Sequence, residues 1–323
     1  MSKFLILMAT YNGEKYLREQ IDSLRQQTLT DWKLLVRDDN SDDSTTEIVK
    51  EYQELDPRII LLEDSYGGTG SPHLNFEKLL IASLRYQAEI YMFADQDDVW
   101  ICKKLERISK SVGIMSKEWA TVPTIIYSDL MVVDEKLNEL SKSFMSFQGL
   151  HHELVNPAST LSVQNFVTGC SSAFNRCLIE LSVPFDTAVV MHDWWLALLA
   201  SFNGKVDYID APLVKYRQHS HNQVGAKGKD LWRNPFKPYL YKNVIAAPLS
   251  LKYTIMQAIA AAKRSNERGY SNFLIDSVSR LENAGLVDRF KVFFANRLTK
   301  QHWTLSIYMY FLLFFVNFKS YRE

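Results

Sequence analysis

Short apolar runs alternate with longer amphipathic segments along the first 135 residues. The runs have the length of buried strands, and the segments between them repeat apolar residues at helical spacing. This alternation is typical of an α/β fold with a mostly parallel, Rossmann-like sheet flanked by helices. The pattern predicts strands over residues 4–9, 32–37, 59–62, 89–94 and 124–133, and helices over residues 14–27, 43–55, 71–87 and 100–119.

The alternation weakens beyond residue 134. A short strand is expected over residues 206–209, and helical spacing returns over residues 251–262 and 273–284, so we expect a helical C-terminal extension. The apolar run over residues 305–316 is shorter than the ~20 residues that a spanning helix needs. It predicts an interfacial membrane helix, its aromatic residues at the headgroup boundary, or alternatively a buried packing or dimer helix.

The composition excludes several classes of protein. With 323 residues, of which 47% are hydrophobic and 23% charged, the chain is large enough for one big domain plus an extension. Lys+Arg and Asp+Glu are equal at 37 each, so no overall positive field favours a nucleic acid. The cysteines Cys102, Cys170 and Cys177 lack the paired spacing of zinc ligands, and their odd number fits a reducing cytoplasm. The apolar start is too short to span a bilayer and runs straight into polar residues, so we expect a first strand there rather than a signal peptide.

Three carboxylates follow the predicted strand over residues 89–94 within four positions. They are Asp95, Asp97 and Asp98, and ligands of open α/β sheets bind at this end of the strands. Crowded carboxylates repel one another, and a hard divalent cation such as Mg²⁺ or Mn²⁺ relieves the repulsion. The alternative is an acidic turn at the start of the next helix.

Other polar residues follow the neighbouring strands. Thr10, Tyr11 and Asn12 follow the first strand, and the aromatic ring offers a surface for a nucleobase. Asp38 and Asp39 follow the second, where a carboxylate can accept a hydrogen bond from a base or ribose. The glycine-rich stretch 67–71 precedes a helix that bears Asn75, and this stretch could touch phosphate.

These motifs in this order resemble the donor half of family 2 glycosyltransferases, which have the GT-A fold. The likeness rests on Ala9-Thr10-Tyr11-Asn12, Asp38-Asp39-Asn40-Ser41 and Asp95-Gln96-Asp97-Asp98, and it covers about the first 135 residues. Ala9 stands where the family often has proline, and Asn40 where it often has glycine. Asparagine tolerates a positive φ, so the turn is expected to survive.

The resemblance implies roles for these residues and a division of the chain. Residues 1–135 would bind a nucleotide-sugar donor, residues 136–230 the acceptor, with residues 231–323 as the helical extension. Asp97 would be the principal metal ligand and Asp95 would lie near the ribose or the metal. Donor contacts are expected from the strand-end residues Thr10, Tyr11, Asn12, Asp38, Asp39, Asn75 and Asp95.

An acid that could act as base follows at Met191-His192-Asp193-Trp194-Trp195. A partly desolvated carboxylate has a raised pKa, and tryptophan faces pack on sugar rings. The stretch resembles the acceptor-side motif of inverting members of the family, which makes Asp193 the general base and His192, Trp194 and Trp195 acceptor contacts. The alternative is that Asp193 caps a helix whose tryptophans are core residues.

A second family-like element is Tyr216-Arg217-Gln218-His219. The resemblance implies that His219 ligates the metal or binds the diphosphate and that Arg217 pairs with phosphate oxygens. Ordinary surface residues remain the alternative.

The motifs together most resemble bacterial rhamnosyltransferases of cell-wall and capsule assembly, which use dTDP-L-rhamnose. The resemblance implies transfer of one sugar to a saccharide or lipid-linked saccharide, in the cytoplasm or peripherally on the inner face of the plasma membrane. The absence of a late Gln-x-x-Arg-Trp element distinguishes the chain from processive synthases. Glucosyl, galactosyl or N-acetylhexosaminyl transfer from a UDP-sugar stays open, as do a nucleotidyltransferase, a non-catalytic nucleotide-sugar binding protein and a homodimer.

Overall fold

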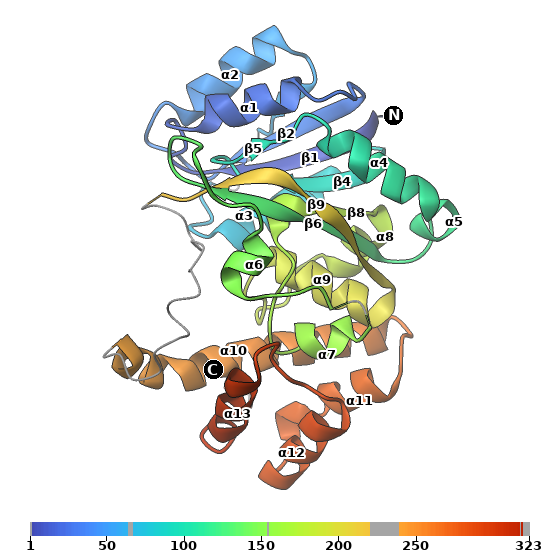
Figure 1. Cartoon of the computed structure of the whole chain (residues 1–323). Coiled ribbons are helices and arrows are strands. Elements are labelled where there is room, and N and C mark those ends of the chain that lie inside the picture. Colours follow the sequence, from blue (N-terminus) through green and yellow to red (C-terminus); the bar gives the residue numbers. More distant parts are fainter. Residues whose placement is uncertain (1, 64–66, 154, 220–238, 317, 319–323) are drawn as a thin grey trace.

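The strands form one continuous sheet. A computed structural model describes residues 2–63, 67–153, 155–219, 239–316 and 318. The strands are β1 (Ser2–Thr10), β2 (Trp32–Asp38), β3 (Ile59–Leu61), β4 (Ala88–Ala94), β5 (Val99–Trp100), β6 (Thr124–Val133), β7 (Glu139–Ser141), β8 (Ser172–Phe174) and β9 (Lys205–Arg217). Within the described residues they form a nine-stranded sheet in the order β3-β2-β1-β4-β8-β6-β9-β5, with β7 beside β6 (Figure 1).

The helices connect these strands and then form the C-terminal extension. They are α1 (Leu17–Arg25), α2 (Thr45–Leu55), α3 (Pro72–Ser83), α4 (Lys104–Ile114), α5 (Ser116–Trp119), α6 (Phe144–Gln148), α7 (Pro157–Leu161), α8 (Arg176–Ser182), α9 (His192–Asn203), α10 (Tyr239–Glu267), α11 (Phe273–Ser279), α12 (Leu286–Ala295) and α13 (Trp303–Leu312). Short 3₁₀ turns cover Gly169–Ser171 and Leu281–Asn283.

The central strands are buried on both faces. β1 pairs in parallel with β2 and β4, and successive side chains of a strand point to opposite faces. Leu5 and Leu7 therefore enter one hydrophobic core and Phe4, Ile6 and Met8 the other. This explains why the strand is a nearly continuous apolar run.

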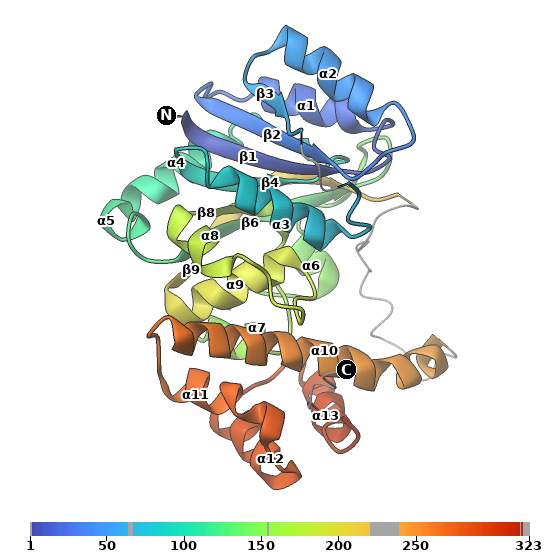
Figure 2. The ribbon, with the colours of Figure 1, turned by 180° about the vertical axis from the view of Figure 1, so that it is seen from behind.

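Each core has its own covering helices. Residues of α1, α2 and α4 pack on one face of the sheet, and residues of α3, α8, α9 and α10 on the other. Figure 2 shows α3 against the sheet and α10 running below α9. Because α9 lies between the sheet and α10, its residues from Trp195 to Ala200 are fully buried.

The mostly parallel sheet flanked by helices is confirmed, as are the C-terminal helices. Two predicted elements are wrong in detail. The helix expected over residues 100–119 begins only at Lys104, because Val99 and Trp100 form a short strand antiparallel to β9. The strand expected over residues 206–209 extends from Lys205 to Arg217, because it pairs with β6 and β5.

The C-terminal extension begins with the 29-residue helix α10, followed by three shorter helices, α11 to α13. Figure 1 places α12 and α13 at the end of the molecule opposite α1 and α2. In the parts of the chain that the structure describes, no helix is both long enough and apolar enough to span a membrane.

Candidate active site

The ends of β1, β2 and β4 bring the predicted donor residues to one edge of the sheet. In the parallel register Thr10 lies beside Asp38, and Met8 lies beside Ala94, the residue before Asp95. The Thr10 hydroxyl donates a hydrogen bond of 2.8 Å to the Asp38 carboxylate. Motifs separated by more than 80 residues therefore meet in space.

Hydrogen bonds of the Gln96 side chain connect the loop after β1 to the acidic loop. The Gln96 side chain accepts a hydrogen bond from the Tyr11 backbone N–H and donates one to the Tyr11 carbonyl, each of 2.9 Å. A Cβ at Gly13 would lie only 2.3 Å from the Gln96 Oε1, so a larger residue here would displace the Gln96 side chain from this position. The Tyr11 side chain remains 56% exposed and free to meet a ligand.

Asp38 and Asp39 face different partners in the turn after β2. Asp38 accepts hydrogen bonds from the backbone N–H and the hydroxyl of Ser41 at 2.8 and 2.6 Å. Asp39 accepts bonds from the backbone N–H groups of Thr69 and Gly70 at 2.6 and 3.0 Å. Asn40 has a φ of 64°, which confirms that asparagine tolerates the conformation of this turn. A base or ribose would have to share the oxygens of Asp39.

Arg37 connects the turn after β2 to α3 and to the glycine-rich stretch. Its buried guanidinium pairs with Asp39 at 3.0 Å and donates to the Asn75 Oδ1 at 2.9 Å and to the Gly67 carbonyl at 2.8 Å. Asn75 is itself buried, and its amide also lies 3.4 Å from the carbonyl of Thr10. The structure thus places Asn75 behind the donor edge, where it supports the backbone.

The acidic cluster after β4 is crowded, and its member Asp98 has no exposed surface. Burial, and next the charges of Asp97 and Asp193, raise the pKa of Asp95 to about 7. Burial, and next the charges of Asp97 and Asp95, raise the pKa of Asp98 well above its usual range. One oxygen of Asp98 is buried without a hydrogen-bond partner among the described residues. Nearby positive charges and hydrogen-bond donors therefore do not fully compensate the negative charge of the three carboxylates.

A buried lysine lies beside these acids. Lys104 has no exposed surface, donates a 2.6 Å hydrogen bond to the Cys170 carbonyl and lies 3.4 Å from the centre of the Trp100 ring. Burial lowers its pKa to about 7, against the opposing influence of Asp98 and Asp95. Lys104 therefore supplies part of the positive charge near the cluster.

His219 and Arg217 approach the acidic loop from the end of β9. The His219 Nε2 lies 2.8 Å from the Asp97 Oδ2, so the two predicted metal ligands are neighbours. Arg217 is buried and donates to the carbonyls of Asp97 and Glu135 at 2.8 and 2.6 Å, and it also pairs with Glu19. A direct phosphate contact by Arg217 would require it to leave these partners. The structure places it as a support of the loop.

The carboxylates fit a hard divalent cation. One ligand atom each from Asp95, Asp98 and Cys170 lie within 4.8 Å of one another. Burial raises the pKa of the Cys170 thiol, so the sulfur stays protonated and the carboxylates are the candidate ligands. The unpartnered oxygen of Asp98 and the adjacent Asp97 complete an oxygen-rich group of the kind that Mg²⁺ and Mn²⁺ prefer.

Asp193 lies in the first turn of α9 and faces the same edge. Its Oδ2 accepts a 3.1 Å hydrogen bond from the backbone N–H of Gly169, and burial raises its pKa to about 6. A Cβ at Gly169 would lie 3.4 Å from the Asp193 Cβ and 3.0 Å from the His192 Nε2, so the small residue permits the close approach. The N-cap is Met191, so Asp193 is not the cap itself.

Two of the three predicted acceptor contacts are corrected by the structure. Trp195 has no exposed surface and donates its indole N–H to the Ser182 carbonyl at 3.0 Å. His192 is 4% exposed, with its ring stacked 3.9 Å from Phe76, and burial lowers its pKa to about 3. Both side chains lie on the buried part of α9 and fix the helix in the core. Trp194 is partly exposed and stays a candidate.

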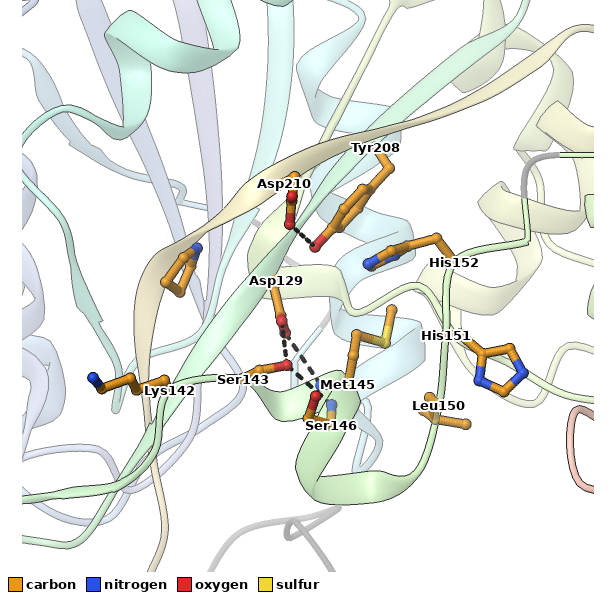
Figure 3. Close-up of a pocket in the computed structure, with 11 residues that line it drawn as sticks. Asp129, Lys142, Ser143, Met145, Ser146, Leu150, His151, His152, Tyr208 and Asp210 are labelled. Carbon is orange, nitrogen blue, oxygen red and sulfur yellow. Dashed lines mark hydrogen bonds between the residues drawn. The ribbon is translucent and has the colours of Figure 1, made fainter.

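A separate open cavity of about 450 Å³ lies between α6, β6 and β9 (Figure 3). Its walls include Asp129, Asp210, Tyr208 and His152, and the Tyr208 and His152 rings are stacked. None of the predicted site residues lines it. It lies in the region expected to face the acceptor, and its mixture of carboxylates and aromatic faces suits a polar ligand with apolar patches.

Three supporting residues were missed by the sequence analysis, namely Arg37, Gln96 and Lys104. Gln96 lies inside a quoted motif and Arg37 directly precedes one, so their position was a signal, but their partners come from distant loops. Lys104 lies outside the quoted motifs, and only its burial beside the cluster reveals its charge contribution.

Comparison with known proteins identifies the family. The model of the glycosyl transferase family 2 matches residues 5–176, more than half of the chain. The chain is 28% identical over 223 residues to the dTDP-rhamnosyl transferase RfbG of Shigella flexneri, covering 68% of this chain and 74% of that protein. It is 27% identical over 271 residues to an Escherichia coli protein, the UDP-Glc:alpha-D-GlcNAc-diphosphoundecaprenol beta-1,3-glucosyltransferase WfgD, covering 83% and 96%.

Solved structures of glycosyltransferases share the fold. Staphylococcus aureus TarS 1-349 in complex with UDP superposes with a TM-score of 0.51 at 15% identity, covering 81% of this chain and 83% of that one. The mannosyltransferase PcManGT of Pyrobaculum calidifontis, in complex with GDP-Man and Mn2+, has a TM-score of 0.50 at 15% identity, covering 97% and 86%. With its GT-A fold and matching motifs, the chain belongs to glycosyl transferase family 2 and is a glycosyltransferase.

Proposed function

We propose that this glycosyltransferase inverts the configuration of the sugar that it transfers, with Asp193 as the general base. The observation that supports this most is the raised pKa of Asp193, about 6, at the edge where the donor motifs end. A base with a pKa near the working pH is both ionised and able to take a proton. Asp193 is also near enough to Asp95 for its charge to raise the pKa of that carboxyl.

The reaction would be a single displacement. Asp193 accepts the proton of an acceptor hydroxyl, and the hydroxyl oxygen bonds to the anomeric carbon on the face opposite the diphosphate. The bond from that carbon to the diphosphate oxygen breaks, and its electron pair leaves with the nucleoside diphosphate. The backbone N–H groups of Gly169 and Trp194 donate to the two oxygens of the Asp193 carboxylate at 3.1 and 2.6 Å, which orients the carboxylate independently of substrate.

The acidic loop would hold the donor diphosphate through a divalent cation, Mn²⁺ or Mg²⁺. Asp95, Asp97 and Asp98 are the proposed ligands, with His219 beside Asp97. Such a cation supplies positive charge to the departing diphosphate. Arg217 holds the loop in position, Lys104 lies beside the acids, and Tyr11 offers its exposed ring to the nucleobase.

We infer that the donor is dTDP-L-rhamnose and the acceptor a saccharide or lipid-linked saccharide at the inner face of the plasma membrane. The likeness to a dTDP-rhamnosyl transferase supports the donor, and the name of the second relative, which acts on a diphosphoundecaprenol-linked sugar, supports the acceptor. A UDP-glucose donor is the second candidate, favoured by the greater coverage of that second relative.

A panel of nucleotide sugars tests the donor. A ligand that binds only the native state raises its melting temperature by mass action, so dTDP-L-rhamnose with Mn²⁺ should stabilise the protein more than UDP-glucose does. Larger stabilisation by UDP-glucose, together with turnover of that donor, would replace rhamnose with glucose. Stabilisation without turnover of any donor, at any acceptor, would favour a binding protein.

The cavity of Figure 3 is proposed as part of the acceptor site. Replacing Tyr208 with alanine removes the aromatic face of its wall. We expect the KM for the acceptor to rise about tenfold, since an aromatic contact of ~1 kcal/mol and its buried area are lost, with the KM for the donor unchanged. An equal rise in both would place the defect in the fold.

A further inference from the structure

The outward face of α13 is apolar, unlike that of an ordinary surface helix. Trp303, Ile307 and Phe311 follow one another at helical spacing and are 70%, 60% and 55% exposed. Phe314 and Phe315 continue this face in the turn after the helix. The opposite face is apolar too and is buried through Met309 and Leu312. The helix therefore packs one apolar face against the protein core and exposes a second apolar face to solvent.

Aromatic contacts join this surface to α12. The Phe294 ring stacks on Tyr310 with the centroids 4.9 Å apart, and Phe290 contacts Phe314 at 5.0 Å. Phe294 is itself 63% exposed. We call the combined surface the aromatic patch; its members are Phe294, Trp303, Ile307, Phe311, Phe314 and Phe315. Contiguous exposed apolar groups of this kind mark a surface that meets another apolar phase or protein.

The segment that carries most of the patch is positively charged. Residues 285–316 contain four basic residues and a single acid, Asp288, a formal charge of +3, whereas the whole chain is neutral. The basic residues are Arg289, Lys291, Arg297 and Lys300. A symmetric dimer through the patch would set two such segments against each other. Two positively charged segments would repel each other, whereas an anionic surface would attract the basic residues.

We propose that the aromatic patch docks onto an anionic lipid bilayer, with α13 lying in the plane of the headgroups. Trp and Phe side chains enter the boundary between headgroups and acyl chains, and the exposed Lys291 and Arg297 meet the anionic lipid. The ten-residue helix spans ~15 Å, too short to cross the ~30 Å hydrocarbon core, so it lies on the surface. The docking extends the proposed transfer to a lipid-linked acceptor but does not depend on the sugar.

Vesicle flotation with the purified full chain tests the docking without any measure of sugar transfer. Wild type should float with vesicles that contain phosphatidylglycerol. Phe311→Ser and Trp303→Ser should each bind about tenfold more weakly, because each removes an aromatic side chain from the buried surface. Leu55→Ser and Ile114→Ser remove apolar side chains that are 70% and 79% exposed elsewhere, and they should bind as wild type does.

The charge is tested separately. Arg297→Gln should weaken binding to phosphatidylglycerol vesicles about fivefold, the equivalent of ~1 kcal/mol, and should not change binding to phosphatidylcholine vesicles. Failure of wild type to float, or equal loss in Leu55→Ser, would overturn the proposal. So would light scattering that shows a dimer in wild type and a monomer in Phe311→Ser without vesicle binding, because a second copy would then cover the patch.

Discussion

A cluster of three carboxylates and the single carboxylate of Asp193 lie at the carboxyl edge of the sheet, and their surroundings differ. The cluster of Asp95, Asp97 and Asp98 has Lys104 buried beside it and the imidazole of His219 2.8 Å from Asp97. The hydrogen bonds of Asp193 described above come instead from backbone N–H groups, those of Gly169 and Trp194. Crowded acids suit the binding of a cation, and a single desolvated acid suits the uptake of a proton.

The strongest test of this comparison removes the charge of Asp193. In Asp193→Asn we expect kcat to fall about 10²- to 10⁴-fold, since the amide cannot accept the proton, while donor binding stays unchanged. Turnover assays beside a calorimetric titration with the donor and Mn²⁺ measure both. Asp186→Asn, which changes an exposed acid before α9, is the matched control. Full turnover in Asp193→Asn would remove it as the base.

The second test removes a carboxylate from the cluster. Asp97→Asn should raise the Mn²⁺ concentration needed for half activity at least about tenfold, because a charged ligand is lost. Excess Mn²⁺ should restore part of the activity, and a chelator should abolish the activity of wild type. Unchanged activity in the presence of chelator would show that the cluster serves some purpose other than holding a cation.

The third test uses pH. Asp193 must be ionised to accept a proton, and its pKa is about 6, so kcat should fall about tenfold for each unit below that value and should be level above it. Saturating donor and Mn²⁺ separate this effect from protonation of Asp95, whose pKa is raised to about 7 by burial and by the charge of Asp97. A kcat that stays level down to pH 5 would contradict the assigned base.

The fourth test, with the smallest expected effect, asks whether Lys104 acts on the acidic cluster alone. Lys104→Met removes a positive charge beside the cluster but leaves Asp193 its backbone donors. We expect about a fivefold change in the Mn²⁺ requirement, equivalent to ~1 kcal/mol, with the pH dependence of kcat unchanged. Metal titrations and pH profiles of this variant are compared with Lys103→Met, which alters the exposed neighbour. A shifted pH profile would show that the two acidic groups share this lysine.

Local patterns were enough to predict where the donor loops lie. The predicted strands ending near Thr10, Asp38 and Asp95 are all present, and their parallel register brings the three residues to one edge. Asn40 adopts the positive φ expected of it. These predictions succeeded because strand length, apolar composition and turn chemistry depend on residues close in the chain.

The errors came from contacts between distant segments. Trp100 was expected in a helix, but it pairs with Val214, more than a hundred residues away. Trp195 was expected at an acceptor, yet the sheet and α10 bury it. Arg37 joins Asp39 to Asn75, and no local pattern relates those positions.

The sequence alone determined the family, the alternation of strands and helices, and the acids that follow β4, because each depends on the order and spacing of residues. The tertiary structure decided which acids are buried, which cations lie beside them and which aromatic residues reach the surface. Those properties follow from the packing of β9, α9 and α10 against segments far away in the chain, which sets the burial and charge around every side chain.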